Sequence, residues 1–112
     1  MLKIHDNIVE FTKGDSVRIT VNMRHHDGYP YKMQVGDTLT LTIRKSLDSP
    51  VALQVASDSS VITLTAEQTK QLEPGVCCYD IELRTYSGEV YTVTGVTDTV
   101  RTNMRVWPEV TE

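Results

Sequence analysis

The chain has 112 residues and a formal net charge of −4 at pH 7. This length suits one hydrophobic core, so the sequence predicts a single domain over residues 1–112. The negative charge and the scattered positions of the 11 basic residues argue against nucleic-acid binding, which concentrates Lys and Arg on one face. No apolar run reaches the ~20 residues of a membrane span, and the start lacks a signal peptide's apolar segment. We therefore expect no membrane partner and synthesis in the cytoplasm, where thiols stay reduced.

Valine, threonine and isoleucine together supply 35 residues, and such β-branched side chains pack well on a pleated sheet. Strict alternation of apolar and polar residues in 17–21 and again in 38–44 predicts strands with one buried face. Turn-forming Gly, Asp, Ser and Pro residues separate these runs from further strand candidates. In chain order those candidates are residues 8–11, 52–56, 61–64, 76–84, 90–93 and 100–107. The pattern predicts an all-β sandwich or small barrel of seven or eight strands.

One short helical turn is expected near residues 66–72. Thr65 is placed to cap it, and Gln68, three residues later, is placed to reach back to the Thr65 amide. Pro74 and Gly75 then end the turn and begin the next strand.

Cys77 and Cys78 are adjacent in the strand predicted over residues 76–84. Alternation places Cys77, Tyr79, Ile81 and Leu83 on an apolar face, which we expect to form part of the core. Cys78 falls on the opposite, mostly charged face, so we expect it to be exposed and to react quickly with a thiol reagent. Two side chains pointing in opposite directions are poorly placed to share a metal ion or form a disulfide. The sequence predicts a structural Cys77, an incidental Cys78 and no cofactor.

The loop from His25 to Pro30 contains the one other cluster of potential ligands. His25, His26 and Asp27 have the chemistry to bind a divalent metal, although Asp27-Gly28 is typical of a solvated turn. No sequence motif of a nucleotide-binding loop, a zinc protease or a serine hydrolase is present. We therefore expect no catalytic residues, no metal site and no enzymatic activity.

Exposed aromatic rings are the alternative source of a binding site. Tyr29, Tyr31 and Tyr86 lie in or beside predicted loops, whereas Tyr79 and Tyr91 are expected to be core or half-buried. The Ser87-Gly88 turn joins two strand-like runs as a hairpin. The predicted binding residues, all in loops, are His25, His26, Tyr29, Tyr31, Tyr86 and Glu89.

Three segments in order, "DGYPYKMQVGDTLTLTIRKS", "ITLTAEQTKQLEPG" and "YDIELRTYSGEVYTV", resemble small immunoglobulin-like proteins. Those proteins are encoded among tail genes of phages and prophages of Gram-positive bacteria. The resemblance covers residues 14–95 and implies an immunoglobulin-like β-sandwich. Cys77 stands where such sandwiches carry the tyrosine of the tyrosine corner, so packing or Tyr79 must hold that corner here. The segment after Gly95 fits the pattern less well.

The resemblance implies a non-enzymatic tail or baseplate protein that assembles with other tail proteins, as a homo-oligomer or as part of a larger assembly, and ends in the virion. The alternative hypothesis is a glycan-binding or adhesion module that recognises the bacterial cell surface through Tyr and Trp107. A metal-dependent enzyme using the His25–Asp27 turn is the third.

Overall fold

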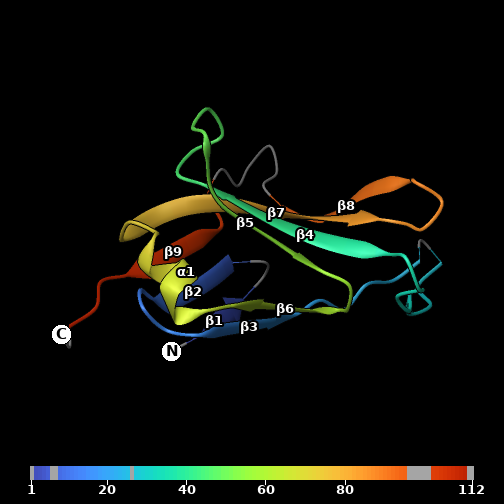
Figure 1. Ribbon diagram of the computed structural model, residues 1–112, viewed down its shortest axis with the longest axis horizontal. Coiled ribbons are helices and arrows are strands. Elements are labelled where there is room, and N and C mark those ends of the chain that lie inside the picture. Colours follow the sequence, from blue (N-terminus) through green and yellow to red (C-terminus); the bar gives the residue numbers. More distant parts are fainter. Residues whose placement is uncertain (1, 6–7, 26, 96–101, 111–112) are drawn as a thin grey trace.

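The structure, a computed structural model, describes residues 2–5, 8–25, 27–95 and 102–110. Within these ranges it has nine β-strands and one short helix (Figure 1). The strands are β1 (Lys3–His5), β2 (Ile8–Thr12), β3 (Val17–Thr20), β4 (Thr38–Arg44), β5 (Val51–Ser57), β6 (Val61–Leu64), β7 (Gly75–Arg84), β8 (Val90–Thr94) and β9 (Met104–Trp107), and the helix is α1 (Ala66–Lys70). The all-β prediction is confirmed, and β1 is a strand that the sequence pattern did not indicate.

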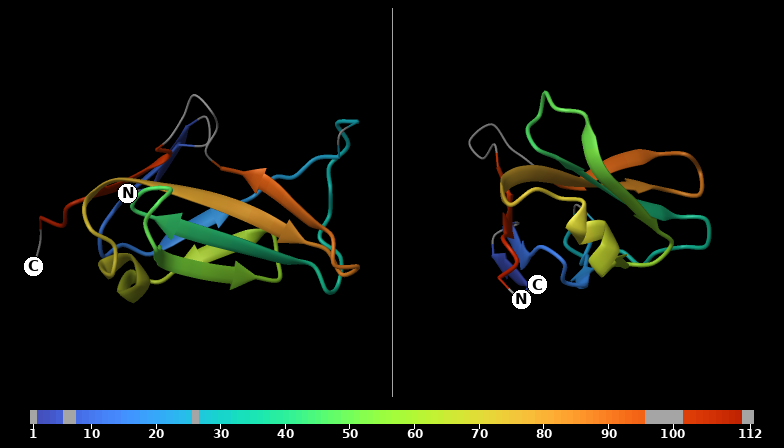
Figure 2. Two further views of the ribbon diagram at one scale, coloured as in Figure 1. Left: turned by 90° about the horizontal axis from the view of Figure 1, so that it is seen from above. Right: turned by 60° about the vertical axis from the view of Figure 1, so that its left-hand side comes forward.

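The strands form two layers. One sheet has the order β1-β2-β9-β7-β4-β5, with β8 also paired to β7, and the second consists of β3 and β6. β2 runs parallel to β9, while β4 and β7 are antiparallel. Figure 1 shows β3 and β6 lying opposite β4 and β7, and Figure 2 shows the same arrangement from two further sides. Pairing β3 with β6 and β4 with β7 gives the B–E and C–F pairs of an immunoglobulin-like sandwich.

The core lies between these layers and follows the predicted alternation. Leu39, Leu41 and Ile43 of β4 have no exposed surface, and Ile62 and Leu64 face them from β6. The predicted face of β7 is also confirmed, because four of its residues are buried: Cys77, Tyr79, Ile81 and Leu83. The inward residues of both sheets exclude water from one another, which is the main stabilising contribution in a sandwich of this kind.

Two strands pair with the same edge of β7, β9 near its start and β8 near its end, and the Asn103 side chain bonds to β7 between them. β7 pairs with β9 through residues 75–77 and with β8 through residues 81–84. Between them, the buried Asn103 side chain accepts a hydrogen bond from the Tyr79 N–H (2.8 Å) and donates one to the Tyr79 carbonyl (3.0 Å). The side-chain amide therefore takes the place of a neighbouring strand's backbone.

Helix α1 is capped as predicted. The Thr65 hydroxyl accepts a hydrogen bond from the Gln68 N–H (3.1 Å), and the Gln68 side chain accepts one from the Thr65 N–H (2.9 Å). The fully buried Thr69 hydroxyl donates to the Asp15 carbonyl (2.8 Å) and accepts from the Gly14 N–H (3.0 Å). Hydrogen bonds of Thr69 thus join the helix to the β2–β3 turn, a link that the expectation of packing or Tyr79 at this corner did not include.

The prediction that Cys78 is exposed is wrong. Its side chain does point away from Cys77, but the residue is only 3% exposed. Its thiol lies 3.5 Å from the carbonyl of Arg44, the residue opposite it on β4. Arg44 is itself half-buried, and its guanidinium donates to the Ser49 carbonyl (2.8 Å) in the β4–β5 connection. The prediction from alternation assumed that the outer face of the sheet is open to solvent. At this end the neighbouring strand's Arg44 lies on that face beside Cys78.

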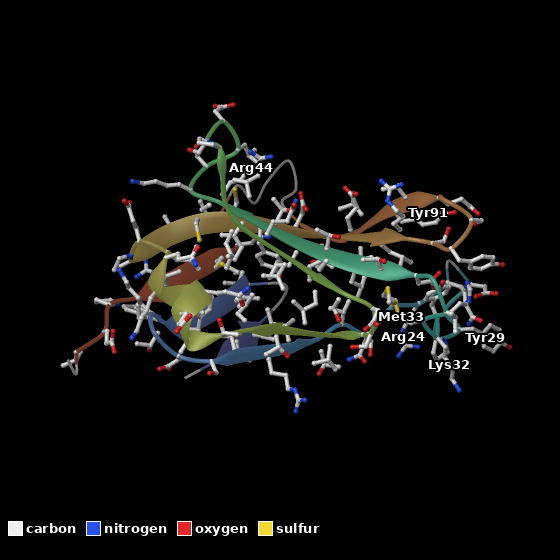
Figure 3. All side chains as sticks on the ribbon, in the orientation of Figure 1. Arg24, Tyr29, Lys32, Met33, Arg44 and Tyr91 are labelled. Atoms are coloured by element: carbon white, nitrogen blue, oxygen red, sulfur yellow. The ribbon has the colours of Figure 1, made fainter. Side chains whose placement is uncertain are left out.

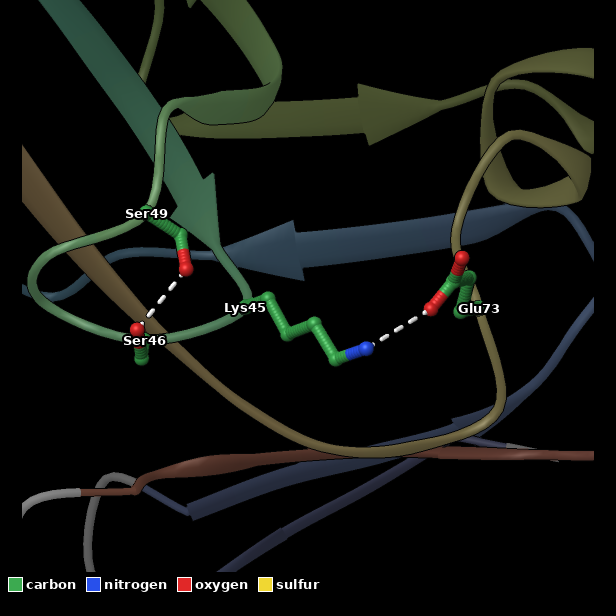
Figure 4. A network of polar contacts seen from close by, with 4 residues as sticks. All are labelled: Lys45, Ser46, Ser49 and Glu73. Carbon is green, nitrogen blue, oxygen red and sulfur yellow. Dashed lines mark hydrogen bonds and ion pairs between the residues drawn. The ribbon is translucent and has the colours of Figure 1, made fainter.

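The β4–β5 connection makes polar contacts at the surface (Figure 4). The Ser46 and Ser49 hydroxyls lie 2.7 Å apart, and the Lys45 ammonium is 3.0 Å from the Glu73 carboxylate. Both charged side chains are about three-quarters exposed, so solvent screens their attraction and the pair adds little stability.

Candidate functional site at the loop end

Two connections meet at one end of the sandwich. We call this the loop end and define it as residues 21–25 and 27–37, between β3 and β4, together with residues 85–91, the β7–β8 turn and the start of β8. Figure 3 shows Arg24, Tyr29, Lys32, Met33 and Tyr91 at this end. The turn closes through hydrogen bonds from the Thr85 N–H to the Glu89 carbonyl (2.8 Å) and from the Gly88 N–H to the Thr85 carbonyl (2.9 Å).

A buried carboxylate joins the two connections. Asp37 is 1% exposed, and its oxygens accept hydrogen bonds from the Tyr31 hydroxyl, the Gln34 N–H (2.9 Å) and the Tyr86 N–H (2.9 Å). The Tyr31 hydroxyl, followed by the backbone N–H of Gln34, lowers the pKa of Asp37. The same hydrogen bond, with added effects of burial and of the Asp37 charge, raises the pKa of Tyr31 to about 12. Asp37 is therefore ionised and Tyr31 neutral at physiological pH.

Gly36 lets the two connections approach closely. Its φ of +94° is one that residues with a side chain rarely adopt, and a Cβ placed there would lie 2.9 Å from the Tyr86 Cβ. A glycine is thus required at position 36 for both its backbone conformation and its contact with the turn.

The tip of the first connection is a small ordered loop. Arg24 and Pro30 form an isolated β-bridge, and the His25 N–H donates to the Tyr29 carbonyl (2.8 Å). The Arg24 guanidinium donates to the Gly28 carbonyl (3.0 Å). The His25 ring packs edge-to-face on the Tyr31 ring, with centroids 5.3 Å apart. Tyr29 projects from this tip with 71% of its surface exposed.

An open cleft of about 820 Å³ lies between the two connections. Its base includes the apolar side chains of Met23, Leu83 and Val93, and polar and aromatic side chains line the rest. From the first connection these are Asn22, Arg24, His25, Tyr31 and Gln34, and from the β7–β8 hairpin Thr85, Tyr86, Ser87, Glu89, Tyr91 and Thr92. The volume falls in the range of small-molecule sites.

Glu89 is held in a fixed position on one wall. Its carboxylate accepts hydrogen bonds from the Tyr91 hydroxyl and from the Ser87 hydroxyl (3.0 Å). These two hydrogen bonds, that of Tyr91 first, lower the pKa of Glu89, and the bond to Glu89 raises the pKa of Tyr91. The cleft therefore carries an oriented negative charge beside a tyrosine ring.

Four of the six predicted binding residues line this cleft: His25, Tyr31, Tyr86 and Glu89. Tyr29 lies at the same end but outside the cleft lining, and His26 lies outside the described residues. Trp107 is separate from these tyrosines. It sits on β9, where its indole N–H donates to Glu10 (3.1 Å) and the Arg105 guanidinium lies 4.7 Å from its ring centroid.

Sequence reasoning missed Asp37, Gly36 and Tyr91. Tyr91 was expected to be core or half-buried, and its 51% exposure agrees with half-buried, but its place in the lining of a cleft was not predicted. The alternation of Tyr91 with Val93 indicated that both side chains lie on one face of β8. It did not indicate how much of the Tyr91 ring is exposed. Asp37 directly precedes an alternating strand, a position that is usually solvated, so nothing local marked it as buried.

Asp27, proposed above as a metal ligand, forms a hydrogen bond within its own loop. The Asp27 carboxylate accepts a hydrogen bond from the Tyr29 N–H (3.2 Å). Within the described ranges, His, Cys, Asp and Glu side chains do not gather in groups of three that could hold a metal ion. Among the same residues, none of the helices has the length and apolar character needed to span a membrane.

No family model, curated protein or solved structure matches the chain in comparisons with known proteins.

Proposed function

We propose that the protein is a non-enzymatic structural module of a phage or prophage tail or baseplate that acts through protein–protein assembly. The loop end is its contact surface, and the partners are other copies of the chain or other tail proteins. On this proposal the chain is made in the bacterial cytoplasm and ends in the virion. The tail context rests on the sequence resemblance to immunoglobulin-like tail proteins.

The observation that carries the contact surface is the gathering of exposed apolar side chains at the loop end. Tyr29 is 71% exposed, Val35 98% and Tyr86 71%, and Val90 and Tyr91 are each about half exposed. Tyrosine is enriched at protein interfaces because it buries a large area and loses little conformational freedom. The hydrogen bonds of Asp37 hold the connections in place before binding, which reduces the entropy lost on association.

The test is the solution mass by light scattering over a tenfold range of concentration. We expect a defined symmetric oligomer, such as a trimer or hexamer. The double variant Tyr29→Ser/Val35→Ser removes two exposed apolar groups outside the cleft and should shift the mass to that of the monomer. Val110→Ser is the matched control, because Val110 is 94% exposed and lies outside the loop end. An unchanged oligomer mass for the double variant would contradict assembly through this surface. A wild-type monomer at every concentration would contradict self-assembly and leave other tail proteins as the partners.

Recognition of a cell-surface glycan is a second function, favoured by the polar, tyrosine-lined cleft at the same end.

A further inference from the structure

We infer that the cleft at the loop end is a binding site for a neutral oligosaccharide. The inference rests on the second proposed function, and it shares with the proposed assembly role the loop end and the exposed rings of Tyr86 and Tyr91. The residues that carry it, Tyr86, Glu89 and Tyr91, differ from the tip residues Tyr29 and Val35 used to test assembly.

The aromatic rings provide flat apolar surfaces of the size of a sugar ring. Tyr91 pairs with Leu83 across the β7–β8 ladder, so both side chains lie on the same face and the half-exposed Tyr91 extends the apolar base of the cleft outward. Tyr86 adds a second exposed ring from the turn. A sugar presents C–H groups on its ring faces and hydroxyls around its rim, so it suits rings that combine an apolar face with a polar edge.

The polar groups of the cleft match the hydroxyl rim. A carboxylate has about four acceptor sites, and Glu89 uses two of them for Tyr91 and Ser87. The remaining sites can accept hydrogen bonds from sugar hydroxyls, and their direction is already fixed. Across the cleft, the side chains of Asn22 and Gln34 have planar amides, each of which both donates and accepts; the Gln34 amide already donates to the Lys32 carbonyl (3.0 Å) and keeps its second N–H and its oxygen. A side-chain amide therefore suits a sugar hydroxyl, which also both donates and accepts hydrogen bonds.

The charges of the site select a neutral ligand over an anionic one. Glu89 is ionised because its hydrogen bonds lower its pKa, and the ionised Asp37 lies behind the Tyr31 and Tyr86 wall. The whole chain adds a formal charge of −4. Among the described residues that line the cleft, Arg24 is the one lysine or arginine, and its guanidinium already donates to the Gly28 carbonyl. Phosphate-rich or carboxylate-rich polymers would therefore be repelled.

The experiment is a titration of the ¹⁵N-labelled protein followed by amide NMR shifts. The probes are three neutral trisaccharides, chitotriose, maltotriose and cellotriose, each up to about 10 mM, where a millimolar site would be occupied. Tetramethylammonium and tripolyphosphate serve as a cationic and an anionic probe. We expect at least one trisaccharide to shift the amides of residues 86–91 and of Asn22, and the two ions to leave them unchanged.

Three variants test the residues. Tyr91→Ala should weaken binding about tenfold, because it removes the stacking ring and the hydroxyl that orients Glu89. Glu89→Gln should also weaken binding, while Val110→Ser, at an exposed position outside the loop end, should bind as the wild type does. The amide spectrum of each variant shows directly whether it is folded.

Absence of shifts with all three trisaccharides would overturn the inference, as would binding of only tetramethylammonium or only tripolyphosphate. Unchanged affinity of Tyr91→Ala would also overturn it. Because assembly is measured on Tyr29→Ser/Val35→Ser and sugar binding on Tyr91→Ala, failure of one leaves the other result readable.

Discussion

At the scale of single residues, the adjacent cysteines show how burial decides chemistry. Burial, followed by the neighbouring Cys78, raises the pKa of Cys77 to about 11, and burial also raises the pKa of Cys78. The thiolate is the reactive form of cysteine. Both thiols are therefore protonated at neutral pH and shielded from reagents, whichever face of β7 they occupy.

We accordingly expect neither cysteine to react quickly with a thiol reagent such as dithiobis-nitrobenzoate in the native protein at pH 8. Both should react in denaturant, which serves as the control for reagent and thiol content. A rapid phase corresponding to one thiol in the native protein would show that Cys78 is accessible after all.

The Asp37–Tyr31 pair makes a prediction about pH. The folded-state pKa of Asp37 is lowered from 3.8, so its stabilising effect is present above pH 4 and is lost as the pH falls through the lowered value. The pKa of Tyr31 is raised from 10.0 to about 12, so its stabilising effect is complete below pH 10 and is lost as the pH rises towards 12.

Ultraviolet titration of tyrosine ionisation measures this directly. The wild type should show a tyrosine component near pH 12 that Tyr31→Phe lacks. In Asp37→Asn the component should move towards pH 10, because the carboxylate that holds the phenol proton is gone. Because the pKa values of Tyr79 and Tyr91 are also raised, the amplitudes are compared, and a component near pH 12 with the same amplitude in Tyr31→Phe as in the wild type would contradict the pair.

At the scale of elements, Asn103 completes a ladder that the split between β8 and β9 would leave open. Asn103→Ala leaves the backbone N–H and C=O of Tyr79 buried without these partners. We expect a loss of about 2–4 kcal/mol in the free energy of unfolding, measured in denaturant with an unchanged m value. Asn22→Ala, an exposed asparagine, is the control and should change it by less than about 0.5 kcal/mol. Equal effects of the two substitutions would show that the Tyr79 hydrogen bonds contribute little.

The cap of α1 gives a smaller and more local prediction. Thr65→Ala removes the hydroxyl that accepts the Gln68 N–H, so it should lower the free energy of unfolding by about 1 kcal/mol. Thr65→Ser keeps the hydroxyl and should retain most of that stability. Thermal unfolding of both variants separates the two effects, and a serine variant as unstable as the alanine variant would rule out the cap as the cause.

At the scale of the whole molecule, the loop end depends on two connections being brought within contact of each other. Gly36 and Gly28 both have positive φ, but only Gly36 faces a neighbour, the Tyr86 Cβ. Alanine at either position should cost about 1–2 kcal/mol for the backbone conformation. Gly36→Ala should cost more and should shift the amide NMR signals of residues 85–89, whereas Gly28→Ala should leave those signals unchanged. If the amide signals of residues 85–89 stay at the same positions in both variants, the contact between residue 36 and the β7–β8 turn does not affect that turn.

Much of the fold was predictable because its signals are local. Alternation identified the buried faces of β3, β4 and β7, since a strand with one side in water must place apolar residues at every second position. The Thr65–Gln68 pair identified the start of α1 for a similar reason, because a capping box involves residues only three apart. Four of the residues that line the cleft were also named, because loop tyrosines and charged residues in a hairpin turn are recognisable without knowing where the loops meet.

What the sequence by itself determined is thus the class of the elements and the inward face of each main strand. The tertiary structure alone decided the burial of Cys78, the exposure of Tyr91 and the role of Asp37. The burial of Cys78 and the role of Asp37 depend on what a second element places beside the residue: Arg44 of β4 lies beside Cys78, and the Tyr86 amide reaches Asp37 from 49 residues away. Such contacts join positions with no fixed spacing, so no periodicity along the chain records them.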